Sequence, residues 1–214
     1  AVTEAINGRI VHAGQACCSS KRFIVQENIY DEFAGRLAER LKGMKIGDPL
    51  DQGSRIGPLI DERAAQRVEE IVDRTVKAGA YCLCGGRRFD GNFFEPTVLT
   101  GVTPAMDIAQ NLEVFGPVFP LIKFKTEEQA VAIADNCTYG LSSGVISGEI
   151  QRAIRVARQL DAGNCTINGT GLYRTHDMPF GGHRKSGLGT EGLYATLDEF
   201  TKTKTYVWKG AAIR

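Results

Sequence analysis

Apolar residues along the chain recur at two spacings, one typical of strands and one typical of helices. After a short apolar stretch at 21–26, residues 29–42 carry Phe33, Leu37 and Leu41 at the spacing of one helix face. The same order of strand and helix recurs farther along the chain. The expected strands are 21–26, 81–84, 97–99, 118–124, 145–146 and 165–167, and the expected helices are 29–42, 62–78, 126–134 and 151–160. Such alternation predicts an α/β fold with a mostly parallel sheet that helices cover on both faces.

The first twelve residues predict a helix that has no start signal. Val2, Ala5, Ile6 and Ile10 fall near one face, with Arg9 elsewhere, and no capping residue precedes them. A truncated chain begins in this way. We therefore expect these residues to belong to a longer protein.

The last forty-odd residues break the alternation. The stretch 169–192 is long and rich in glycine, and a loop of this length in a compact domain is usually functional. Residues 199–209 alternate Phe200, Tyr206 and Trp208 with lysine and threonine, which predicts a terminal strand. No later segment offers it a neighbour, so we expect its partner in another chain.

Composition narrows the class of protein. Six cysteines among 214 residues are too few for a disulfide scaffold, and 43% hydrophobic residues suffice for an ordinary core. A net charge of +1 gives no reason to expect a nucleic-acid or membrane partner. No apolar run approaches the ~18 residues of a spanning helix, and the N-terminus lacks the regions of a signal peptide. We expect a cytoplasmic protein.

Two adjacent cysteines, Cys17 and Cys18, follow Gly14 where the first helix gives way to a strand. A cysteine beyond a glycine turn can act as a nucleophile where its thiolate is favoured. The residues alone leave open that both cysteines are buried small hydrophobes. A cysteine hydrolase could also be assembled from Cys17 and His176, although no spacing supports that pairing.

Two further features carry weaker signals. Cys82 and Cys84 are close enough to share a ligand, but a structural zinc site needs about four ligands and no second pair appears. We therefore expect core cysteines there and no metal site. Glu113 precedes the apolar run 118–124, and a lone glutamate in a loop is more often part of the solvated surface.

The order of four motifs resembles the NAD(P)-dependent aldehyde dehydrogenase superfamily. The segment 14–17, Gly-Gln-Ala-Cys, is similar to its nucleophile motif, and 113–118, Glu-Val-Phe-Gly-Pro-Val, to its cofactor loop. The segments 136–141 and 179–189 resemble its Asn-x-x-Tyr-Gly-Leu and Pro-Phe-Gly-Gly-x-x-x-Ser-Gly-x-Gly runs. The resemblance covers nearly the whole chain and implies a three-layer α/β/α catalytic domain over 1–195.

The resemblance also assigns chemical roles. It makes Cys17 the nucleophile that forms a thiohemiacetal and then a thioester, with its backbone N–H as half of the oxyanion hole. Glu113 would hold the ribose hydroxyls of NAD or NADP, and Phe115 would pack beside the nicotinamide. Phe180 and the loop 169–177 would line the tunnel that admits a small aldehyde substrate.

Substrate choice is expected to depend on the loop 169–177. Arg174 and His176 offer a positive group to an anionic aldehyde, because a guanidinium matches a carboxylate in a two-pronged way. Succinate semialdehyde or a short hydroxyaldehyde such as lactaldehyde is therefore expected. A solvated loop arginine is the competing interpretation.

Several parts of the family pattern are missing. The resemblance places the general base, a second oxyanion donor and the cofactor domain upstream of Cys17, where this chain has only sixteen residues. We therefore expect a C-terminal catalytic portion that is inactive by itself and exposes an apolar patch around Cys17 and Phe115. Residues 196–214 would form an oligomerisation strand and tail, giving a homo-oligomer, either a dimer or a tetramer, in the full-length enzyme.

Two other classes of function remain open. One is a stand-alone thiol esterase or hydrolase, because a reactive thiol can cleave activated esters without a cofactor. The other is a non-catalytic interaction domain that offers its terminal strand to a partner, because an open strand edge invites strand addition.

Overall fold

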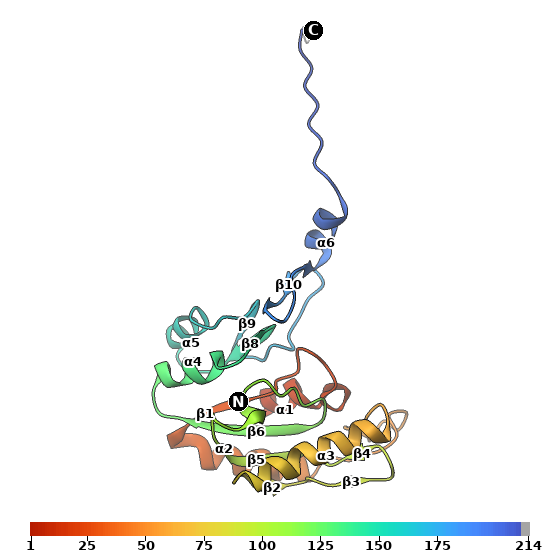
Figure 1. Ribbon diagram of the computed structural model, residues 1–214, viewed down its shortest axis with the longest axis vertical. Helices are drawn as coiled ribbons and strands as arrows, with labels where there is room; N and C mark the ends of the chain where they lie inside the picture. The colour runs from red at the N-terminus through yellow and green to blue at the C-terminus, as the bar shows by residue number, and fades with distance from the viewer. Residues whose placement is uncertain (211–214) are drawn as a thin grey trace.

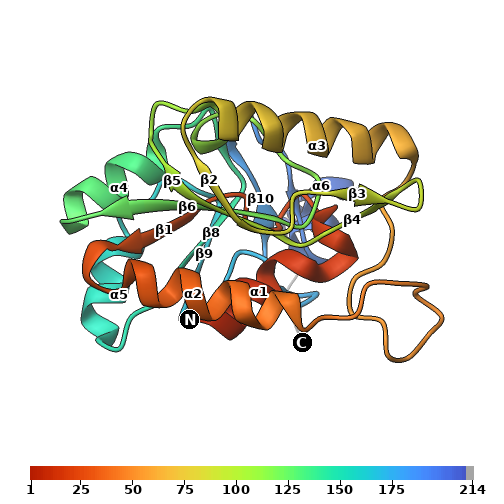
Figure 2. The ribbon, with the colours of Figure 1, turned by 90° about the horizontal axis from the view of Figure 1, so that it is seen from below.

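The computed structural model describes residues 1–210, and its main sheet has four strands. Their order is β1 (Phe23–Gln26), β6 (Val118–Phe124), β5 (Thr97–Val102) and β2 (Tyr81–Cys84). The pairs β1–β6 and β6–β5 are parallel, and β2 joins the edge antiparallel to β5. Helix α3 (Glu62–Lys77) covers one face of this sheet, and α1 (Val2–Ile10) and α2 (Tyr30–Lys42) lie on the other (Figure 2). This confirms the three-layer α/β/α class with a mostly parallel main sheet.

The core lies where the two central strands meet these helices. Val98, Leu99, Phe119, Leu121 and Ile122 are fully buried, as strands covered on both faces require. Burying a side chain of this size stabilises the fold by roughly 1.5–3 kcal/mol. The central sheet is therefore the rigid part of the molecule, and the loops that connect its strands extend from it.

The helices follow the predicted spacing, with one correction. Asp61 caps α3 by accepting the backbone N–H of Ala64 at 2.7 Å. The sequence spacing of Val68, Val72 and Val76 predicts that all three face inward, but Val76 is 38% exposed and Thr75 is buried instead. Thr75 can take the inner position because its hydroxyl donates to the Ile71 carbonyl one turn earlier, at 2.7 Å.

A register shift separates the two cysteines of β2. Cys82 pairs with Leu99 and Cys84 with Val98, so the strand is irregular between them. Cys84 is buried, as expected, whereas Cys82 is exposed, so the expectation of two core cysteines is wrong for Cys82.

A second, smaller sheet lies beside the main one (Figure 1). It consists of β8 (Ser142–Val145) and β9 (Asn164–Ile167), which pair in parallel and are connected by α5 (Ile150–Ala157). The predicted mostly parallel sheet is confirmed for the main sheet, and this strand–helix–strand unit forms a parallel pair of its own. The physical reason lies in β8, whose Ser-Ser-Gly-Val sequence lacks the apolar residues that a strand buried on both faces requires.

The shorter elements connect these layers. They are η1 (Val11–Gly14), η2 (Glu27–Ile29), β3 (Arg88–Phe89), β4 (Phe93–Phe94), η3 (Asp107–Ala109), α4 (Glu127–Asp135), β7 (Tyr139–Gly140), β10 (Phe180–Gly181), β11 (His183–Arg184) and β12 (Thr190–Glu191). Among residues 1–210, no helix combines the length and the apolar content needed to cross a bilayer.

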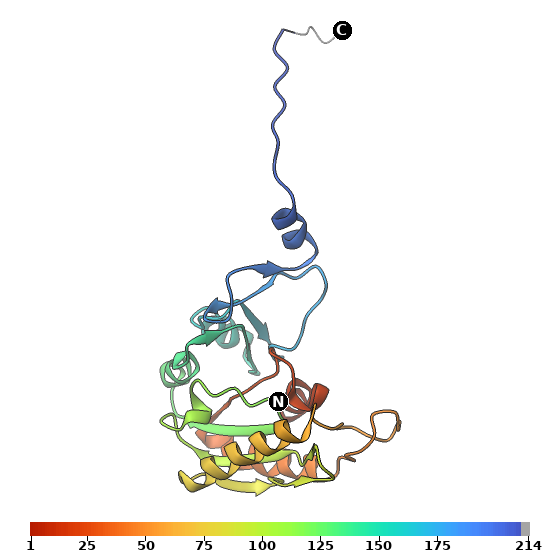
Figure 3. The same cartoon turned by 45° about the vertical axis from the view of Figure 1, so that its right-hand side comes forward.

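The C-terminal region differs from its prediction. Helix α6 (Leu193–Phe200) includes Glu199 and Phe200, where a strand was expected, and it crosses the expected boundary between 195 and 196. Residues 201–209 are exposed, form no paired strand within the described chain, and extend away from the body (Figure 3). The physical reason is that a strand is defined by its neighbour, because its backbone groups need partners to form a ladder.

Candidate active site

The turn that precedes Cys17 has an unusual backbone. His12, Ala13 and Gly14 all have positive φ, at 49°, 53° and 79°. Two of them carry a Cβ, so the turn stores strain of order 1–3 kcal/mol per residue. Glycine at position 14 avoids such strain, and it is also required sterically, because a Cβ there would lie 2.3 Å from the Gly116 carbonyl oxygen. The backbone preceding Cys17 therefore touches the loop that contains Glu113 and Phe115.

Side chains on either side of Cys17 hold the turn in place. The Gln15 amide donates to the His12 carbonyl at 2.8 Å, and its oxygen accepts the Ile60 backbone N–H at 2.9 Å. The buried Ser19 hydroxyl donates to the Gly8 carbonyl in α1 at 3.1 Å. The turn is thus tied to α1 and to the loop that precedes α3.

Cys17 itself is exposed, whereas Cys18 is partly buried. Burial raises the pKa of the Cys18 thiol, and the neighbouring Cys17 raises it further, so Cys18 is held in its unreactive form. The Gln15 and Ser19 N–H groups donate to the His12 and Ala16 carbonyls, but within residues 1–210 the Cys17 N–H has no backbone acceptor. An exposed thiol beside a free N–H is the arrangement that an oxyanion requires.

Lys21 connects the turn around Cys17 to the loop 113–118, which contains Phe115. Its ammonium donates to the carbonyls of Ala16 at 2.7 Å, Cys17 at 3.1 Å and Ser19 at 3.0 Å. The same nitrogen lies 4.8 Å from the centre of the Phe115 ring, within cation–π range. Burial and, to a smaller extent, the nearby Arg9 lower the pKa of Lys21 to about 8, although Glu113, Cys17 and Cys18 act in the opposite direction.

Arg9 joins the same two segments from inside the protein. It is fully buried and donates to the carbonyls of Val114 at 2.6 Å and Val118 at 2.9 Å, and to the Ser19 hydroxyl at 3.2 Å. Burial lowers the pKa of its guanidinium to about 9, while the charge of Glu113 raises it. The sequence-based placement of Arg9 away from the core is wrong, because its guanidinium finds acceptors in the interior.

Glu113 and Phe115 lie on the open side of this arrangement. Glu113 is exposed, and the Phe115 ring is 41% exposed, in agreement with the exposure expected around Cys17 and Phe115. A carboxylate that is free to accept two hydroxyl hydrogens and a ring with an open face fit the ribose and nicotinamide of a dinucleotide. The residues present therefore suit one end of NAD or NADP.

Arg174, His176 and Phe180 form a separate group. The Arg174 guanidinium stacks on the Phe180 ring at 4.2 Å and forms an ion pair with Glu191 at 3.2 Å. The His176 carbonyl accepts the N–H of Leu193 at 3.0 Å. No hydrogen bond, ion pair or ring contact among residues 1–210 connects these three residues with Cys17. The proposed pairing of Cys17 with His176 therefore has no geometric support.

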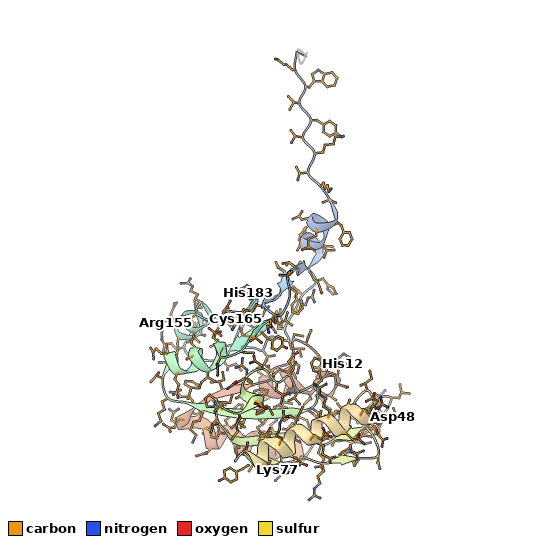
Figure 4. The ribbon with its side chains drawn as sticks, in the orientation of Figure 1. His12, Asp48, Lys77, Arg155, Cys165 and His183 are labelled. Carbon is orange, nitrogen blue, oxygen red and sulfur yellow. The ribbon has the colours of Figure 1, made fainter. Side chains whose placement is uncertain are left out.

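The two other histidines belong to different parts of the molecule (Figure 4). His12 lies in the strained turn, and His183 on β11 forms a 2.8 Å hydrogen bond with Asp161. His183 is thus already engaged in a surface network that includes the Arg184–Asp161 ion pair at 2.9 Å.

A groove of about 390 Å³ lies between α1 and the segment that follows β9. Close packing defines one wall, because a Cβ on Gly8 would lie 2.6 Å from the Thr170 side chain. The groove is lined by Glu4, Asn7, Gly8, Thr166, Ile167, Asn168, Gly169, Thr170, Leu172 and Tyr173. The early part of the loop 169–177 therefore lines a cavity, whereas Arg174 and His176 do not.

Sequence reasoning missed Arg9 and Lys21. A signal for Arg9 existed, because it lies four residues after Ala5 and three after Ile6, on the apolar face of the first helix. No sequence signal marks Lys21, whose neighbours at 16, 17, 19 and 115 come together only in the folded chain.

Comparison with known proteins identifies the family. Residues 1–206 match the aldehyde dehydrogenase family. The chain is 36% identical to lactaldehyde dehydrogenase of Methanococcus aeolicus, over 97% of this chain and 44% of that protein. It is 41% identical to mitochondrial succinate-semialdehyde dehydrogenase of Rattus norvegicus, over 98% of this chain and 40% of that protein.

A solved structure agrees with these sequences. Glyceraldehyde-3-phosphate dehydrogenase GapN of Methanocaldococcus jannaschii, complexed with NADP, superposes with a TM-score of 0.88 at 37% identity, covering 93% of this chain and 43% of that one. The fold defines a three-layer α/β domain, and the chain belongs to the aldehyde dehydrogenase family. It spans less than half the length of these relatives.

Proposed function

We propose that Cys17 is the nucleophile in an NAD(P)-dependent oxidation of an aldehyde to a carboxylic acid. The observation that carries this proposal is the exposed Cys17 thiol on a strained turn, with a free backbone N–H and an open Phe115 ring beside it. Cys18 is a poorer nucleophile, because burial raises the pKa of its thiol. Family membership agrees with this chemistry.

Each chemical step assigns a task to residues of this chain. The Cys17 thiolate attacks the aldehyde carbon, and the new oxyanion accepts a hydrogen bond from the Cys17 N–H. The oxyanion then collapses and expels hydride, leaving a thioester on Cys17. Water hydrolyses the thioester to the carboxylic acid and frees the thiol.

The cofactor, NAD or NADP, supplies the acceptor for that hydride when it is bound. Glu113 would hold the two ribose hydroxyls, and the open face of Phe115 would orient the nicotinamide toward Cys17. The contact between Gly14 and Gly116 supports this arrangement, because it fixes the thiol turn against the loop that contains both residues.

The substrate proposed here is a small aldehyde, either a short hydroxyaldehyde or succinate semialdehyde. The groove beside α1 is large enough for a few heavy atoms, and Thr166, Asn168 and Thr170 in its lining offer polar groups. Arg174, whose guanidinium stacks on the Phe180 ring, would attract a distal carboxylate on the substrate.

Replacing the thiol tests the function directly. In the full-length protein, Cys17→Ser should reduce aldehyde-dependent NAD(P)H formation by roughly 10³-fold or more, because a hydroxyl is a far weaker nucleophile. Cys18→Ser is the matched control and should retain most of the activity. Full activity in Cys17→Ser would overturn the proposal. Residues 1–214 produced alone should form negligible NADH, since the resemblance places the base upstream.

We also propose that residues 201–209 pair with a second copy of this chain. Tyr206, Val207 and Trp208 are each more than 80% exposed on an extended segment. An unpaired extended segment with apolar side chains is suited to adding a strand to another sheet. Light scattering of the full-length protein over a concentration series should give a dimer or tetramer mass, and a monomer at all concentrations would contradict the pairing.

A further inference from the structure

The Lys21 side chain, like that of Arg9, contacts both the segment 16–19 and the loop that contains Phe115. It donates to three backbone carbonyls of the segment 16–19, including that of Cys17, and lies under the Phe115 ring. The three carbonyls belong to the turn, and the ring belongs to the loop that precedes β6. The turn that carries the nucleophile and the loop that would orient the cofactor are therefore joined through one ammonium group.

The surroundings of the Lys21 ammonium disfavour its positive charge. Burial and the nearby Arg9 both disfavour the ammonium. Three other charged or titratable groups face it and favour the charged form, namely Glu113 from the loop before β6, and Cys17 and Cys18 from the turn. A buried cation is tolerated when its donors are used, and here three carbonyls occupy all three N–H groups of the ammonium.

We propose that Lys21 is a positioning residue that holds the Cys17 turn against the Phe115 loop and thereby sets the reactivity of the Cys17 thiol. This inference rests on the proposed function, because it assumes that Cys17 is the reactive cysteine. It goes beyond that function in assigning to Lys21 a role in the site although its side chain does not react.

The protonation of Lys21 makes this role dependent on pH. The ammonium is fully present below about pH 7 and is lost as the pH rises through its pKa of about 8. A neutral amine has only two N–H donors for three carbonyls and no charge to attract a thiolate or the Phe115 ring. The hold on the turn should therefore weaken on the alkaline side.

The test measures alkylation of Cys17 by iodoacetamide in the full-length protein, read by peptide mass spectrometry so that Cys17 and Cys18 are counted separately. Lys21→Met removes the ammonium, and Lys21→Arg retains a charge that does not titrate in this range. Lys123→Met is the matched control, because Lys123 lies 4.6 Å from the ring of Tyr30, a cation–π contact of the same kind in a different part of the fold.

Below about pH 7, Lys21→Met should alkylate Cys17 roughly threefold to tenfold more slowly than the native protein, the scale of the net contribution of one ordinary hydrogen bond. Lys21→Arg and Lys123→Met should stay within about twofold. Between about pH 7 and pH 9, the ratio of the native rate to the Lys21→Arg rate should fall, because only the native side chain loses its charge.

Different failures have different meanings. If the native protein alkylates Cys18 and spares Cys17, the proposed function itself is wrong. If Cys17 reacts but Lys21→Met matches the native rate at every pH, or if Lys123→Met slows it equally, Lys21 has no positioning role. Should Lys21→Met fail to fold, the comparison of Lys21→Arg with the native protein decides the question, and a constant ratio over the pH range overturns the inference.

Discussion

Arg9 and Arg174 differ in how they are held. The difference separates the part of the candidate site around Cys17 from the part around Arg174. Arg9 is fully buried and donates to two backbone carbonyls and a buried hydroxyl. Arg174 is partly exposed, stacks on Phe180 and pairs with Glu191, whose side chain is 73% exposed. The first contact set belongs to the core, and the second belongs to the surface.

This contrast explains how one fold can combine fixed chemistry with adjustable selectivity. The position of Cys17 is set by buried or backbone-directed contacts, so it tolerates little change. The position of the Arg174 side chain depends on surface contacts that water and salt weaken, so a substitution there has little effect on the rest of the fold. Under the proposed function, the reacting thiol is thus anchored in the core, and recognition of the substrate would fall to a surface loop.

The largest expected difference between the two arginines is in stability. Arg9→Met should lower the free energy of unfolding by about 3 kcal/mol, because it leaves two buried carbonyls without donors. At this chain length that corresponds to a fall of roughly 6–12 °C in Tm. Thermal unfolding followed by circular dichroism measures the change.

Arg174→Met is the matched variant for that measurement. It should change the free energy of unfolding by less than about 0.5 kcal/mol, because surface ion pairs contribute little. Equal losses for the two variants would remove the distinction between a core-anchored half and a surface half.

A smaller effect is expected on selectivity, and it should be confined to Arg174. In the full-length enzyme, Arg174→Leu should lower kcat/KM for an anionic aldehyde by roughly tenfold and leave a neutral aldehyde of similar size unchanged. Glu191→Gln should raise kcat/KM for the anionic aldehyde by about twofold, because it frees the guanidinium from its ion pair. An equal loss for both aldehydes in Arg174→Leu would show that the residue does not recognise charge.

Much of the fold could be read from the sequence because its elements are defined by local patterns. The helical spacing of Phe33, Leu37 and Leu41 and the apolar run 118–124 gave α2 and β6 within a residue or so. Features that depend on distant neighbours were missed. β8 and β9 form their own sheet, and residues 201–209 have no strand partner in the described chain.

The candidate site divides in the same way. The turn around Cys17 and the loop at 113–118 were recognisable because each motif is a short run of neighbouring residues. The order of these runs predicted that Cys17, Glu113 and Phe115 act together, and the contact of Gly14 with Gly116 places the two segments side by side. Arg174 and His176 stay a proposal, since they lie outside the lining of the groove beside α1.

The sequence by itself determined the family, the α/β alternation and the identity of the thiol segment, because these are properties of residues that are adjacent along the chain. Only the tertiary structure decided which charges stabilise that segment. Arg9 and Lys21 are twelve residues apart, yet both bind the turn around Cys17 and the loop around Phe115. Hydrogen bonds to backbone carbonyls offset the free-energy cost of burying these two charges, and only folding brings those carbonyls within reach.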